Sequence, residues 1–199
     1  MNKEGLKKEE VKKDIHLTPA RAMLLYALAE YERRGEMASV FAANKLAYFL
    51  QESGEPLKLK FIPYIYGPYS QAVGKVLYAL NGKYLSGLEQ MNAKAFEPLE
   101  IKYDNLGEVE AFVESKLTQV QRDRLTSVFH LIEGFESTLS LEVLSSIHFL
   151  RTQDKNLSRD ELLAKIHSWS DRKKSLIKEE YIDIALKHLD NFAGKMTVA

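Results

Sequence analysis

Hydrophobic residues recur every three to four positions along most of the chain, a spacing typical of amphipathic helices. Thr18 followed by Pro19 is a helix start, because the hydroxyl can cap the first turn and proline costs no hydrogen bond there. Ser158 and Glu161 have the spacing of a capping box that opens another helix. Together with glycine and proline stops, this pattern predicts helices over residues 19–34, 39–53, 70–80, 106–116, 119–133, 141–150, 162–169 and 178–192.

Two stretches depart from the helical spacing. Residues 57–61 (LKLKF) alternate apolar and basic side chains, which predicts a short strand with one solvated face. Residues 62–69 (IPYIYGPY) contain two prolines and a glycine, which predicts a loop. An edge strand is expected within residues 84–104. Strand pairing is therefore expected in one small sheet built from 57–61 and part of 84–104.

The predicted fold is mostly α: a single compact helical domain with a small β element, over residues 17–199. Residues 1–16 mix both charges and contain almost no bulky apolar side chain, so we expect a charged arm or linker there. The apolar stripes of the predicted helices give an expected core that includes Leu46, Phe49, Leu77, Leu80, Phe129, Ile132 and Ile147.

Composition narrows the class of protein. The 28 Lys and Arg residues balance the 28 Asp and Glu residues, which disfavours a strongly basic nucleic-acid binder. Cysteine is absent, which excludes disulfides, a zinc ribbon and a catalytic thiol, and favours a cytoplasmic location. No apolar run approaches the roughly 20 residues that span a bilayer, so no membrane partner is expected.

Local signatures of enzymes are missing from the sequence. It contains no phosphate-binding glycine loop, no GxSxG and no HExxH. His130 and His148 lie beside apolar neighbours on predicted helices. Either could be a general base or a ligand, but a satisfied core or half-buried histidine is the expected interpretation. On this basis we expect no catalytic residue, no metal, no cofactor and no enzymatic activity.

Charge is distributed unevenly. No acidic residue occurs from 56 to 88, where six aromatic residues (61, 64, 66, 69, 78 and 84) occur among four lysines (58, 60, 75 and 83). Cations interleaved with rings suit single-stranded nucleic acid. Seven acidic residues follow between 89 and 114. The expected interpretation is a solvated strand edge with ordinary core aromatics for the basic stretch and a solubilising face for the acidic stretch. The alternative is that these charges dock a charged partner.

Several short segments occur in an order that is found in a known family. They are Thr18-Pro19-Ala20-Arg21, Lys45 to Leu50, Tyr66-Gly67-Pro68-Tyr69, Tyr84, Ile132 to Glu136, and Trp169 with Arg172-Lys173. Over about residues 17–192 the chain thereby resembles the C-terminal, toxin-binding domain of DarG-type antitoxins. It is more distantly similar to the Panacea domain of SocA-like antitoxins.

The resemblance implies a bacterial, non-catalytic antitoxin module. Such a module binds and sequesters a DarT-like DNA ADP-ribosyltransferase toxin by blocking its single-stranded DNA cleft, as a DNA mimic, without itself binding nucleic acid. In the family, ADP-ribosyl hydrolase activity belongs to an N-terminal macrodomain, which residues 1–16 are too short to form. The alternative interpretation is a nucleic-acid-binding module that uses the basic and aromatic stretch 56–88.

A cleft that binds DNA presents cations and stacking faces, so its partner should present carboxylates beside rings. Tyrosine also serves often as an interface anchor. The expected partner-binding residues are Tyr66, Gly67, Pro68, Tyr69, Tyr84, Glu89, Glu97, Glu133, Phe135 and Glu136.

Overall fold

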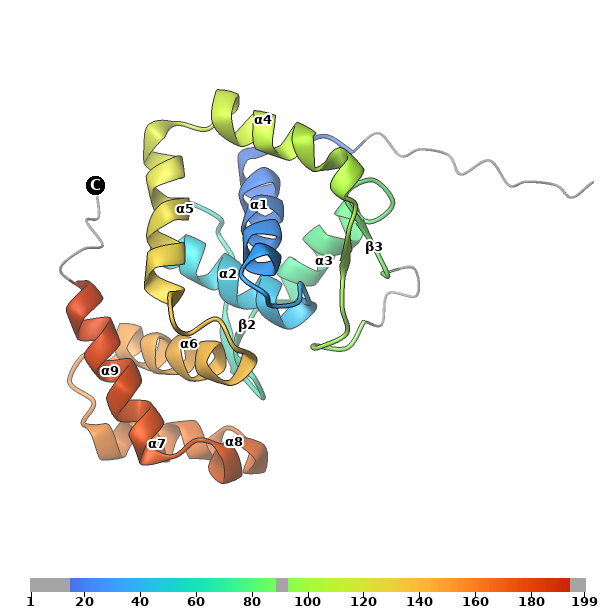
Figure 1. Cartoon of the computed structure of the whole chain (residues 1–199). Helices are drawn as coiled ribbons and strands as arrows, with labels where there is room; N and C mark the ends of the chain where they lie inside the picture. Colours follow the sequence, from blue (N-terminus) through green and yellow to red (C-terminus); the bar gives the residue numbers. More distant parts are fainter. Residues whose placement is uncertain (1–14, 89–92, 194–199) are drawn as a thin grey trace, which may run out of the picture.

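The computed structural model describes residues 15–88 and 93–193, and it is mostly helical. Helix α1 (Pro19–Arg33) lies centrally, against α2 (Val40–Glu52) and α4 (Leu106–Lys116) (Figure 1). A second group, α6 to α9, packs along one side. The remaining helices are α3 (Gln71–Leu80), α5 (Gln119–Ile132), α6 (Thr138–Gln153), α7 (Arg159–Ser168), α8 (Asp171–Leu176) and α9 (Glu179–Ala193).

The predicted caps are confirmed at the starts of the helices. The Thr18 hydroxyl oxygen accepts a hydrogen bond from the backbone N–H of Arg21 at 3.3 Å, ahead of Pro19 in the first turn of α1. Ser158 and Glu161 form the predicted capping box of α7. These side chains satisfy backbone N–H groups that have no partner within the helix.

Three helical predictions need correction. Helix α7 begins at Arg159, directly after its cap Ser158, rather than at the predicted residue 162. Helix α6 is longer than the predicted 141–150, because Ser137 caps it one turn earlier. Helix α8 was not predicted, since its sequence (DRKKSL) has no apolar stripe. It packs by burying the side chain of Lys173 instead.

The predicted position of the small sheet is wrong. Residues 57–61 are not a strand, and the predicted loop 62–69 holds a hairpin of β1 (Ile62–Tyr64) and β2 (Gly67–Tyr69). The side-chain amide of Gln51 takes the place of a partner strand for Leu59, accepting from its N–H at 2.7 Å and donating to its carbonyl at 3.1 Å. Short-range alternation cannot distinguish a side-chain partner of this kind from a strand.

The expected edge strand within 84–104 is confirmed. Strand β4 (Glu100–Ile101) pairs with β3 (Leu85–Ser86) in antiparallel register. Because β1 and β2 pair with each other, the described residues contain two separate two-stranded sheets rather than one.

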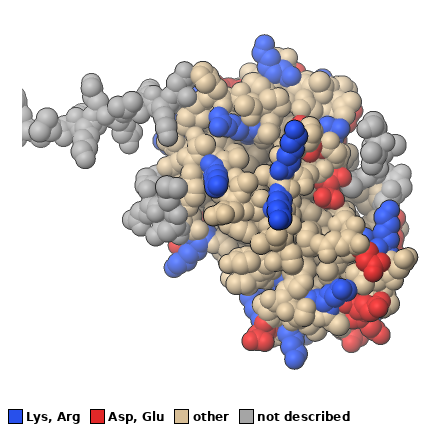
Figure 2. Space-filling model, turned by 180° about the vertical axis from the view of Figure 1, so that it is seen from behind, with Lys and Arg blue, Asp and Glu red and all other residues tan. Residues whose placement is uncertain are grey.

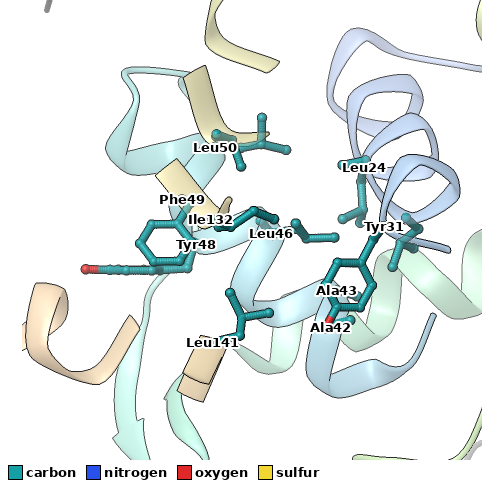
Figure 3. Close-up of a cluster of buried hydrophobic side chains, with 14 of the residues drawn as sticks. Leu24, Tyr31, Ala42, Ala43, Leu46, Tyr48, Phe49, Leu50, Ile132 and Leu141 are labelled. Atoms are coloured by element: carbon teal, nitrogen blue, oxygen red, sulfur yellow. The ribbon is translucent and has the colours of Figure 1, made fainter. Parts of the chain in front are cut away.

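All seven expected core residues are buried. In Figure 3, Leu24 and Tyr31 of α1 face Leu46 of α2, with Ile132 and Leu141 close by. In the expected arm 1–16, Ile15 is buried and His16 is exposed, and residues 1–14 lie outside the described residues. No helix in the described part of the chain is both long enough and apolar enough to cross a membrane.

Candidate functional site

The β1–β2 hairpin lies directly on two helices, α2 and α6. Gly67 and Pro68 are buried at this contact, and Gly67 has a φ of 98°. A Cβ atom on Gly67 would lie 3.0 Å from the Ser146 hydroxyl and 3.2 Å from the Lys45 ammonium nitrogen. Only glycine combines this backbone conformation with such a close approach.

Beneath the hairpin lies a buried ionic cluster whose centre is Glu142. Its carboxylate is fully buried and accepts hydrogen bonds from Arg172 Nη1, at 2.8 and 2.7 Å, and from Lys173 Nζ, at 2.8 Å. Lys173 is fully buried as well and also donates to the Ser146 hydroxyl at 3.1 Å. A buried carboxylate normally persists only when it is paired in this way.

Lys45 is the second buried ammonium group of the site. It is 2% exposed and donates a hydrogen bond to the Pro68 carbonyl at 2.8 Å, which ties α2 to the hairpin. Its nitrogen also lies 5.0 Å from the centre of the Phe41 ring. Burial and, second, repulsion by Lys173 hold the pKa of Lys45 well below its usual value, with Glu142 acting in the opposite direction.

A cavity of about 300 Å³ opens between α2, the hairpin and residues 93–95. Its lining includes Phe41, Asn44, Lys45, Tyr64, Tyr66 and Tyr69. The rings form contacting pairs: Tyr64 and Tyr69 have centroids 5.1 Å apart, and Tyr66 lies 4.6 Å from Phe96. Lys94 also lines the cavity and is exposed, and none of the described lining residues carries a carboxylate.

The sequence analysis missed the exposed apolar surface beside this cavity. Ile62, Tyr64 and Ile65 of the hairpin are 45%, 48% and 38% exposed, and Phe96 is 37% exposed. The apolar and aromatic run IPYIY, residues 62–66, was the sequence signal for this surface. Because residues 62–69 were predicted to be a loop, we did not expect these side chains to form one surface.

Four of the predicted partner-binding residues are buried. Gly67, Pro68, Tyr84 and Phe135 pack inside the protein, and Tyr84 also donates to Glu108 at 2.9 Å. These four residues therefore contribute to packing, and their part in partner binding stays a prediction. In a turn-rich segment, the neighbouring sequence does not show whether a tyrosine or phenylalanine is exposed at a contact surface or buried in the core.

The other predicted residues lie in two different places. Tyr66 and Tyr69 are half-buried in the hairpin, and Glu97 is exposed next to Phe96, which contacts Tyr66. Glu133 is exposed at the end of α5, and Glu136 pairs with Arg34 at 3.4 Å. Glu89 lies outside the described residues.

One lysine of the basic stretch and at least two carboxylates of the acidic stretch are already in ion pairs. Lys83 contacts Glu108 at 2.8 Å, and Arg33 contacts Glu110 at 2.5 Å. Lys58, Lys60 and Lys75 are exposed. Figure 2 shows cationic side chains separated by uncharged surface on one face, rather than a continuous basic patch.

The two singled-out histidines differ in environment. The His148 Nδ1 atom lies 2.7 Å from the Tyr48 hydroxyl, and burial, assisted by Arg151, lowers the pKa of His148 to about 4. His130 is exposed, contrary to the expected half-buried position. Within 15–88 and 93–193, no group of three His, Cys, Asp or Glu side chains is arranged to hold a metal ion.

The curated proteins to which this chain is similar share one name. The chain is similar to DNA ADP-ribosyl glycohydrolases. The protein of that name from Thermus aquaticus is 31% identical over 173 residues, which is 87% of this chain and 47% of the relative. Those from Mycobacterium bovis and Mycobacterium tuberculosis are each 28% identical over 188 residues, 88% of this chain and 53% of the relative. The chain thus spans about half the length of these curated relatives, and no family model matches it.

These names overturn the expectations of an antitoxin module, of DNA mimicry and of no enzymatic activity. The relatives are named as glycohydrolases, and the match covers most of this chain. The motif search excluded an enzyme because it reads only residues that are close together in sequence. The cluster of Lys45, Glu142 and Lys173 shows how distant segments converge without leaving such a motif.

Proposed function

We propose that this chain acts in the removal of ADP-ribose from DNA, within a protein of the DNA ADP-ribosyl glycohydrolase kind. The observation that carries this proposal is the shared name of relatives that match 87–88% of the chain. A cytoplasmic location, where bacterial DNA is found, belongs to the same proposal.

The hairpin supports this function through the chemistry that it exposes. ADP-ribosylated DNA presents bases and phosphates, which are bound by rings and cations. Exposed Tyr64 and Phe96 supply rings, and Lys94 supplies an exposed cation near them. The lining residues within 15–88 and 93–193 include no carboxylate that would repel a phosphate.

We further propose that a DarT-like ADP-ribosyltransferase is a protein partner of the chain. The exposed apolar side chains Ile62, Tyr64, Ile65 and Phe96 form a candidate contact surface, with Glu97 at its edge. Exposed aromatic and aliphatic anchors of this kind are typical of interface centres. Binding of the transferase would place removal of the modification beside the enzyme that adds it.

The function is tested with a single-stranded oligonucleotide that carries ADP-ribose. The purified protein is mixed with it, and released ADP-ribose is measured over time by chromatography. We expect release above the buffer blank, and less release after Tyr64→Ala and Phe96→Ala. Ile184→Ala, at an exposed position of α9, is the matched control. No release by the folded protein would overturn the proposed function.

A further inference from the structure

The charges beneath the hairpin do not balance. Lys45 and Lys173 are both buried, and Glu142 is the one buried carboxylate that faces them among the described residues. The oxygens of Glu142 are already taken by Arg172 and Lys173. Lys45 is left with the neutral carbonyl of Pro68 as its hydrogen-bond acceptor within the described chain.

An anion near Lys45 would relieve this imbalance. A buried ammonium is costly unless an opposite charge compensates it, and Lys173 adds repulsion. Lys45 is one of the residues that line the cavity, so an anion can approach from that side. Asn44 lines the cavity beside it, and Lys94 provides a further cation.

The aromatic rings that line the cavity favour a ligand that also contains a planar group, which can stack on them. Tyr64 and Tyr69 stand 5.1 Å apart with their planes inclined by 32°, and both line the cavity. Tyr66 is held between the Arg172 guanidinium, 4.9 Å from its centre, and Phe96. Tyr64 is the most exposed of these tyrosines and is free to stack on a base.

The volume of the cavity limits which anionic ligand with a planar group can bind. The cavity volume of about 300 Å³ is at the lower end of the range of small-ligand sites, roughly 300–1,000 Å³. One nucleotide fits that range better than a dinucleotide does.

We propose that this cavity binds one nucleoside monophosphate unit, with its phosphate toward Lys45 and Asn44 and its base against Tyr64 and Tyr69. This unit occurs both in the AMP half of ADP-ribose and in a nucleotide of single-stranded DNA. The inference rests on the proposed function for the relevance of these two sources, and on the geometry for the site itself.

The test is calorimetric titration of the folded protein with AMP, adenosine, inorganic phosphate, ADP-ribose and a thymidine oligonucleotide. AMP should bind at least about 10-fold more tightly than adenosine or phosphate, because it engages both halves of the site. Tighter binding of ADP-ribose than of the oligonucleotide identifies ADP-ribose as the source, and the reverse order identifies DNA. Equal binding of AMP and adenosine would overturn the proposal.

Variants locate the binding. Lys45→Met should weaken AMP binding at least about 10-fold, and Tyr64→Ala several-fold, while Ile184→Ala should leave it unchanged. Tyr64 is exposed, so Tyr64→Ala decides the matter if Lys45→Met fails to fold. A folded Tyr64→Ala or Lys45→Met variant with unchanged AMP affinity would contradict the site.

The outcomes separate this inference from the proposed function. Release of ADP-ribose from DNA without binding of AMP would overturn the nucleotide site alone. Binding of AMP without release would overturn the proposed function alone.

Discussion

Replacing Glu142 by glutamine removes the buried negative charge and keeps nearly the same shape. The side chain is fully buried, and its carboxylate accepts hydrogen bonds from Arg172 and Lys173 at 2.7–2.8 Å. In Glu142→Gln, the Lys173 ammonium stays buried without an opposite charge and close to Lys45. Breaking a buried pair from one side costs about 3–5 kcal/mol, a large part of the roughly 5–15 kcal/mol that stabilises an ordinary domain.

The assay is equilibrium unfolding in urea, followed by circular dichroism, for Glu142→Gln, Lys173→Met and the double variant. We expect the double variant to lose less stability than the two single losses added together, with a coupling of at least about 1 kcal/mol. Asp183→Asn, in the exposed pair with Arg159, is the control and should change stability little. Losses that add within about 0.5 kcal/mol, or a Glu142→Gln loss no larger than that of the control, would refute the reasoning.

Three further predictions concern stability and binding. Burial lowers the pKa of His148 from 6.5 to about 4, so as pH falls the unfolded chain binds a proton at this histidine before the folded protein does. The contribution of neutral His148 to stability should be fully present above pH 6.5, and stability should fall by about 3 kcal/mol as pH drops to 4. His148→Gln should flatten this pH dependence in thermal melts. Gly67→Ala should cost about 1–3 kcal/mol in urea unfolding because φ is positive and the new Cβ meets Ser146, whereas Gly74→Ala, in the open on helix α3, should cost nothing. Ile62→Ala, in the exposed surface proposed for the transferase, should weaken calorimetric binding to a DarT-like transferase by about 2 kcal/mol, and unchanged affinity would remove Ile62 from that contact surface.

Helix boundaries were the most predictable part of the fold because their causes are local. The oxygen of Thr18 and the pair Ser158 and Glu161 cap helices within three residues of themselves, so spacing alone reveals them. Strand pairing depends on partners that local spacing does not show. Leu59 bonds to the side chain of Gln51, and the hairpin depends on the fit of Gly67 against α2 and α6, neither of which is visible in a short window.

The candidate site was predictable only in part for the same reason. The tyrosines of residues 64–69 drew attention as a group, and the structure places them around one cavity. Lys45, Glu142 and Lys173 come from three helices, and nothing in their separate surroundings marks them as neighbours. Their burial and charge imbalance became visible only in three dimensions.

The most direct measurement for the central claim is turnover of an ADP-ribosylated single-stranded oligonucleotide by a small amount of the protein. The account predicts that each protein molecule releases more than one ADP-ribose and leaves the unmodified oligonucleotide behind. Release that does not exceed the buffer blank, from protein that circular dichroism shows to be folded and helical, would contradict it.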